Sequence, residues 1–175
     1  GILYAYLGWA IFLSLLAPGQ DEAWMYVETM TKIFVPFLVG LTTIDSTKRL
    51  KQLAWTIALC EGYVALEFNR VYFSGYNQLA EEGFGTLDNN SAAIALVTAL
   101  GISTYLGVSA KRLWAKCLAF SLTAFMGHAV LFSYSRGGML AMVVAAAVGF
   151  LVLKKRPMHY IGFALVAVVG FSQAS

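Results

Sequence analysis

Residues 91–108 read SAAIALVTALGISTYLGV, a stretch of apolar and small side chains without a charge. A helix needs roughly 20 predominantly apolar residues to cross a bilayer. The other apolar segments cover residues 1–17, 23–44, 53–68, 117–134, 138–153 and 160–171. The sequence therefore predicts an all-α fold, a polytopic transmembrane bundle of about seven helices. The segment 53–68 is short and carries Glu61, so a tilted or re-entrant helix is an alternative there.

The composition is that of an integral membrane protein. Hydrophobic residues make up 59% of the chain and charged residues 12%, with a mean hydropathy of +0.72. A soluble domain usually carries about twice that charged fraction. The net charge of +3 is small and dispersed, which argues against nucleic-acid binding. Cys60 and Cys117 belong to no metal-binding pattern, so we expect packed thiols and no metal.

The ends of the chain predict a piece of a longer membrane protein. Gly1 already lies within an apolar run, and Ser175 follows shortly after another. We expect residues 1–175 to form a single transmembrane domain.

Basic residues predict the orientation of this domain. They concentrate in three connections, at residues 48–51, 111–116 and 154–156. Cytoplasmic connections carry an excess of Lys and Arg, so these three are expected inside. Successive connections of a membrane bundle lie on alternate sides, so Arg70 and Arg136 are expected outside. The one long connection, about residues 69–90, becomes an external loop.

Arg136 is the main candidate for binding chemistry. One interpretation is an interfacial arginine whose side chain extends to the outer headgroups. The other is an anion site, because Arg136 runs against the charge bias and Gly137 and Gly138 follow it at an expected helix start. Ser135 adds a hydroxyl. A guanidinium beside free N–H groups suits phosphate, and we expect the pyrophosphate of a lipid-linked substrate.

A second candidate group precedes the helix expected at residues 91–108. Asp88, Asn89 and Asn90 are good N-capping residues, and either they only cap the helix or they also bind sugar hydroxyls or orient an acceptor. Arg70 is a candidate for a second phosphate contact. The aromatic residues of the external loop form either an interfacial belt or a carbohydrate surface. They are Tyr72, Phe73, Tyr76 and Phe84.

Two of these elements carry a resemblance to a known family. Residues 85–90 read GTLDNN, and residues 132–140 read FSYSRGGML. An Asp-Asn-Asn run opening one membrane helix and Ser-Arg-Gly-Gly opening a later one resemble the core of the O-antigen ligase and polymerase superfamily. The chain is most similar to the O-glycosylation ligases associated with the exosortase A system. The resemblance covers roughly residues 50–171.

The resemblance implies a multi-spanning glycosyltransferase of the bacterial inner membrane. Such an enzyme moves a glycan from an undecaprenyl-pyrophosphate carrier to a lipid or protein acceptor on the periplasmic face. It needs no metal, nucleotide sugar or other cofactor, because the pyrophosphate is the activated leaving group. In that scheme Arg136 stabilises the departing pyrophosphate, and Arg70 assists it.

The same resemblance leaves several alternatives open. Family members have a large periplasmic loop after the last helix seen here, with further basic residues and a histidine. We therefore expect the general base beyond residue 175. A glycan polymerase of the same superfamily uses the same kind of donor. A transporter or flippase of lipid-linked sugars, or a structural membrane subunit, remains a non-enzymatic alternative.

Overall fold

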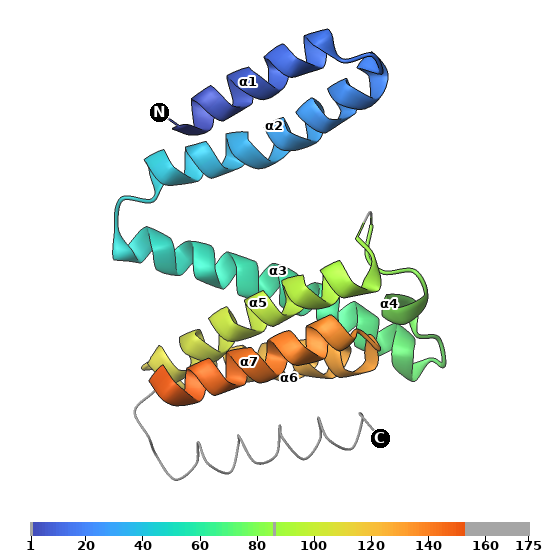
Figure 1. Cartoon of the computed structure of the whole chain (residues 1–175). Helices are drawn as coiled ribbons and strands as arrows, with labels where there is room; N and C mark the ends of the chain where they lie inside the picture. Colours follow the sequence, from blue (N-terminus) through green and yellow to red (C-terminus); the bar gives the residue numbers. More distant parts are fainter. Residues whose placement is uncertain (1, 86, 153–175) are drawn as a thin grey trace. The chain divides into compact units, whose positions relative to one another are not determined.

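The computed structural model describes residues 2–85 and 87–152, and this part of the chain is all helical (Figure 1). The all-α prediction is confirmed for these residues, which contain no strand beyond an isolated bridge between Phe84 and Leu87. The helix expected at 160–171 and the basic residues 154–156 lie outside the described residues. The helices are α1 (Ile2–Leu16), α2 (Gln20–Thr43), α3 (Thr47–Phe73), α4 (Gln78–Glu81), α5 (Asn89–Ser109), α6 (Leu113–Phe132) and α7 (Arg136–Val152).

Helices α2, α3, α5, α6 and α7 begin before the apolar segments that predict them. The largest difference is α3, a continuous helix of 27 residues over the segment expected at 53–68. The added residues include Lys48, Arg49 and Arg70, which interrupt an apolar run but are good helix formers. The end of α3 and the short helix α4 also occupy part of the expected external loop.

Contacts divide the chain into two compact units, Gly1–Lys51 and Gln52–Ser175. Unit 1 contains the hairpin of α1 and α2, in which the rings of Tyr6 and Phe34 meet edge to face at 5.6 Å. The expected pair of Glu28 and Lys32 forms on α2, at 2.6 Å. The single transmembrane domain stays a prediction. The candidate site residues belong to unit 2.

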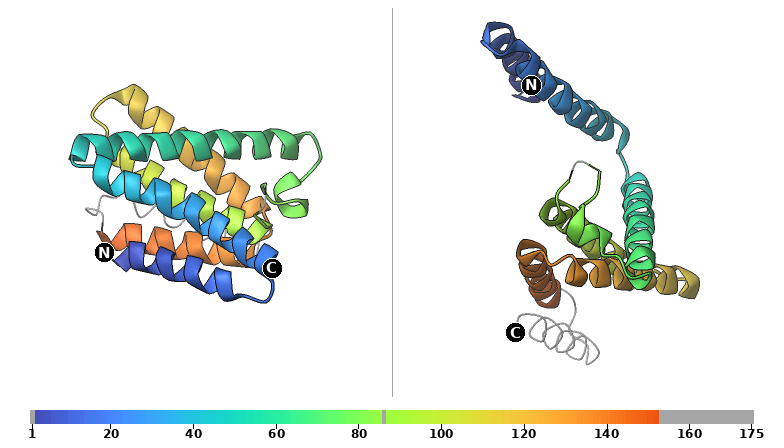
Figure 2. Two further views of the ribbon diagram at one scale, coloured as in Figure 1. Left: turned by 90° about the horizontal axis from the view of Figure 1, so that it is seen from above. Right: turned by 90° about the vertical axis from the view of Figure 1, so that its right-hand side faces the viewer.

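Within unit 2, α5 packs against both α6 and α7 (Figure 2). Small side chains allow helices to approach closely. A Cβ atom at Gly107 of α5 would lie 3.0 Å from the ring of Phe120 on α6, and one at Gly62 of α3 would clash with Leu122. The hydrophobic core joins α3, α5, α6 and α7 through mostly small or unbranched side chains. Its most buried members are Ala58, Ala65, Leu96, Ala99, Leu106, Ala119, Met126 and Val130.

Two of the described helices, α5 and α6, are long and apolar enough to cross a membrane by length and composition. The apolar stretches Tyr4–Leu16 and Arg136–Leu151 are shorter.

The helix ends of unit 2 place the candidate residues at one end. Helices α3 and α6 finish where α5 and α7 begin, on the right in Figure 1. Arg70, residues 88–90 and Arg136 therefore lie at this end, which we call the Arg136 end. The basic connection 111–116 between α5 and α6 lies at the opposite end.

Candidate functional site

The site is built around the turn from α6 to α7, which consists of Ser133, Tyr134 and Ser135. Ser133 is fully buried, and its hydroxyl donates to the carbonyl of Val130 at 2.7 Å. Its Oγ also accepts from the backbone N–H of Ser135 at 3.2 Å. Tyr134 between them has a φ of 52°, in the left-handed region. Buried hydrogen bonds on both sides of Tyr134 thus fix the direction of the turn.

Ser135 is the N-cap of α7. Its Oγ accepts from the N–H of Gly138 at 2.9 Å, and its carbonyl accepts from the N–H of Met139 at 3.0 Å. The helix therefore begins at Arg136, two residues before the predicted start at Gly138. As a consequence, the Gly138 N–H is not free at the helix start, because it already donates to the Ser135 side chain.

The residues before α5 interact with the same turn. The Ser135 hydroxyl donates to Asn90 Oδ1, and Asn89 Nδ2 donates to the carbonyl of Ser133 at 3.3 Å. Asp88 is the N-cap of α5, with Oδ1 accepting from the N–H of Ser91 at 2.7 Å. The structure therefore brings together the two groups that the sequence singled out, across sequence separations of 44 and 45 residues. Contacts of these residues with a ligand stay a prediction.

Glycines let α5 and α7 meet at this point. A Cβ atom at Gly138 would lie 2.6 Å from Cβ of Ala93 on α5. One at Gly137 would lie 3.1 Å from Asn90 Oδ1. Gly138 is buried and Gly137 is exposed. The close approach of α5 and α7 explains why residue 138 is a glycine better than a bare helix start does.

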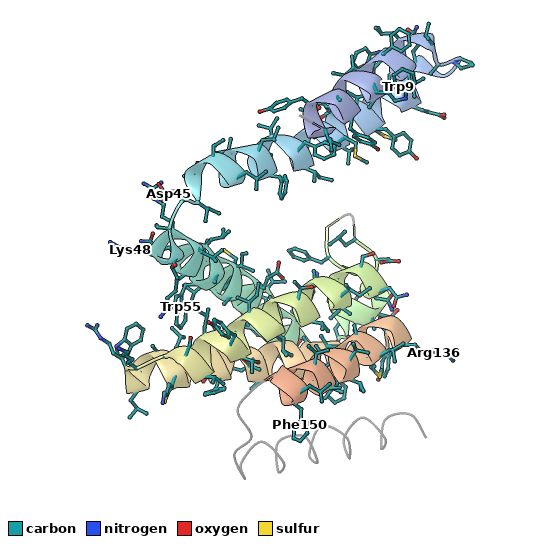
Figure 3. All side chains as sticks on the ribbon, turned by 60° about the vertical axis from the view of Figure 1, so that its left-hand side comes forward. Trp9, Asp45, Lys48, Trp55, Arg136 and Phe150 are labelled. Carbon is teal, nitrogen blue, oxygen red and sulfur yellow. The ribbon has the colours of Figure 1, made fainter. Side chains whose placement is uncertain are left out.

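Arg136 is exposed and points away from unit 2 (Figure 3). Its guanidinium has no hydrogen bond or ion pair with any residue in 2–85 or 87–152. Its backbone is the first residue of a helix whose cap is locked to α5. The backbone of Arg136 is thus held in place, and its guanidinium has no partner among the described residues. This arrangement suits binding of an external anion.

Arg70 differs from Arg136 in having a partner. Its Nη1 lies 3.6 Å from Oε2 of Glu67, one turn earlier on α3. The Arg70 side chain is 78% exposed, so this pair is a weak constraint on the guanidinium. Within the described part of the chain, no hydrogen bond or ion pair joins Arg70 to the turn at 133–135. A second phosphate contact from Arg70 stays a prediction.

Two asparagines that the sequence interpretation did not single out organise this end. Asn77 caps α4 and donates from Nδ2 to the carbonyl of Phe132 at 2.7 Å. Asn69 is buried and donates from Nδ2 to the carbonyl of Phe125 at 2.9 Å. Both side chains donate hydrogen bonds to carbonyls of α6 from segments that are distant in the sequence. Asn69 lies between the charged residues Glu67 and Arg70, so no local pattern in the sequence distinguishes it.

A small cavity lies inside this end, beside His128. An aromatic group surrounds His128, whose ring lies 4.4 Å from that of Phe132 and 5.3 Å from that of Phe73. Beside it, Asn69 and Asn77 help to line a cavity of about 10 Å³. That volume is near the minimum for one water molecule. This cavity therefore has no room for a large ligand.

The cap at Asp88 gives the site a pH dependence. The backbone hydrogen bond from Ser91 lowers the pKa of Asp88 below its ordinary value. The cap therefore contributes stability above the ordinary Asp pKa of about 4, and this contribution is lost as the pH falls through the lowered pKa. We expect Asp88→Asn, whose amide oxygen also caps, to weaken this acid dependence. Thermal unfolding of both proteins between pH 6 and 3 measures it.

Asp88→Ala is the control, because it removes the acceptor and should destabilise α5 at neutral pH as well. The cap account is contradicted if the parent and Asp88→Asn lose stability in parallel on acidification.

No protein-family model, curated protein or solved structure matches this chain.

Proposed function

We propose that the protein is a multi-pass glycosyltransferase similar to O-antigen ligases, located in the bacterial inner membrane. It transfers a glycan from a polyprenyl-pyrophosphate carrier to a lipid or protein acceptor at the periplasmic face. The observation that carries this proposal is Arg136, which is exposed and has no partner among the described residues. It lies where hydrogen bonds join residues 88–90 to residues 133–138.

The surface of unit 2 supports the membrane part of the proposal. Large apolar side chains are exposed along α5, α6 and α7, and water would be an unfavourable environment for so many of them. Lipid chains would cover it at no such cost. Examples are Ile94 (48% exposed), Tyr105 (65%), Leu113 (76%), Leu140 (66%) and Leu151 (73%). The polar groups at the Arg136 end then meet the headgroups, where a lipid-linked pyrophosphate lies.

Arg136 has a defined task in the proposed transfer. The bond between the anomeric carbon of the sugar and the pyrophosphate oxygen breaks, and the pyrophosphate leaves with the electron pair. An acceptor oxygen forms the new bond to that carbon and loses its proton to a base. Negative charge develops on the leaving oxygen, and a guanidinium can bind it through two parallel hydrogen bonds. Such a positively charged group lowers the barrier most when the negative charge that it contacts increases in the transition state.

Release of the carrier tests this function. We expect membranes containing the protein to convert a polyprenyl-pyrophosphate-linked glycan into free polyprenyl pyrophosphate and a glycosylated acceptor, with a chelator present. Mass spectrometry of the extracted lipids measures both products. Membranes without the protein are the control.

A transporter would give a different result. It would move the intact lipid-linked glycan between leaflets of proteoliposomes without releasing free carrier, and that outcome would overturn the proposal. A polymerase would release carrier but extend another lipid-linked glycan, so the identity of the glycosylated product separates these two enzymes.

A further inference from the structure

Tyr134 occupies a backbone conformation that a bulky side chain rarely adopts. Its φ is 52°, and it is the only non-glycine residue with positive φ in the described ranges 2–85 and 87–152. Glycine or asparagine adopts this region at lower cost, because a larger side chain crowds its own carbonyl there. A tyrosine at this position is therefore a strained choice whose use has to be sought in its side chain.

The ring of Tyr134 has no specific partner within the described part of the chain. It is 63% exposed, and it has no hydrogen bond or ring contact with another residue of the described chain. Other aromatic residues at the Arg136 end do have partners. These are Tyr72, Phe73 and Phe132 around His128, Phe84 against Phe68, and Tyr76, whose hydroxyl donates to Glu82.

The turn holds this free ring beside Arg136. Ser133 and Ser135 on either side are 0% and 2% exposed and are fixed by hydrogen bonds to Val130, Asn90 and Gly138. Tyr134 and Arg136 are two residues apart, so their Cα atoms lie within about 7 Å of each other. This separation is comparable to the length of a hexose joined to a phosphate.

We propose that Tyr134 packs on the sugar ring that is bonded directly to the pyrophosphate held by Arg136. This inference rests on the proposed function and adds a specificity residue to it. One face of a pyranose consists largely of C–H groups, and these fit the face of an aromatic ring. Tyr134 thereby favours a carrier that bears a glycan over the bare carrier, which is the product of the transfer.

A role as a membrane anchor explains less. Tyrosines are common at the membrane interface, but an anchoring ring needs no strained backbone. The Arg136 end already exposes Phe73, Tyr76 and Phe84, at 75%, 43% and 48%. Anchoring also predicts no difference between glycosylated and bare carriers.

Binding to the chain in lipid nanodiscs tests the proposal. The probes are polyprenyl pyrophosphate with one hexose attached and the same carrier without it. We expect Tyr134→Gly to weaken binding of the hexose-linked probe about three- to tenfold, by analogy with other aromatic ring contacts. Binding of the bare carrier should not change. Tyr134→Phe keeps the ring and should bind both probes like the parent.

Tyr134→Gly suits this test because glycine accepts the φ of 52° without strain, so we expect its thermal unfolding close to that of the parent. Equal weakening of both probes, or no change in either, would overturn the role of Tyr134.

Arg136→Ala separates this failure from that of the proposed function. If Arg136→Ala weakens both probes while Tyr134→Gly leaves both unchanged, only the sugar contact is wrong. If Arg136→Ala leaves both probes unchanged, the pyrophosphate site itself is wrong.

Discussion

Replacing Arg136 by alanine is expected to lower the rate of glycan transfer by about 100- to 1,000-fold, the effect typical of losing one preorganised charge-stabilising group. The guanidinium is exposed and has no partner within the described residues, so its removal should leave the fold intact. Transfer from a lipid-linked donor in membranes measures the rate, and thermal unfolding checks the fold.

Arg136→Lys should fall between the parent and Arg136→Ala. Lysine keeps the positive charge but cannot offer two parallel donors to a phosphate. Arg112→Ala is the matched control, because Arg112 is exposed at the opposite end of unit 2. We expect Arg112→Ala to transfer at the parent rate. Parent rates in both Arg136 variants would contradict the pyrophosphate role.

Gly138→Ala is expected to lower the free energy of unfolding by about 1–3 kcal/mol, the usual cost of adding a methyl group to a closely packed contact. The new Cβ atom would lie 2.6 Å from Cβ of Ala93, so α5 and α7 would have to separate. Denaturant titration of the purified protein in detergent micelles measures the change.

Two further variants make this prediction specific. Gly101→Ala on α5 has no atom within 4 Å of the added Cβ, so it should stabilise the helix by up to about 1 kcal/mol. Combining Gly138→Ala with Ala93→Gly moves the methyl group to the other helix and should restore much of the lost stability. A double variant no more stable than Gly138→Ala would show that this contact does not set the helix spacing.

The sequence was a good guide to which segments are helical, because apolar runs mark the core of each helix. It was a poor guide to their ends. Apolar patterns stop at Lys48 or Arg70, whereas helical hydrogen bonding continues through such residues. At α7 the start depends on the Ser135 side chain capping Gly138, and a local pattern did not separate that cap from a bare glycine start.

The candidate site was predictable in part. The sequence singled out residues 88–90 and 133–138 as separate candidates, and the hydrogen bonds of Asn89 and Asn90 join them. The strained backbone of Tyr134 and the long-range bond of Asn69 to α6 were not predictable. Both depend on tertiary contacts between segments far apart in the chain, which periodicity and propensity do not encode.

The proposed transfer requires Arg136 to lie on the outer side of the membrane. Cysteine labelling in intact bacterial cells tests this most directly, in a background with Cys60→Ser and Cys117→Ser. We expect Arg136→Cys to react with a membrane-impermeant maleimide added outside. Lys111→Cys, at the opposite end of unit 2, should react only after the cells are permeabilised. Labelling of Arg136→Cys only in permeabilised cells would contradict the account.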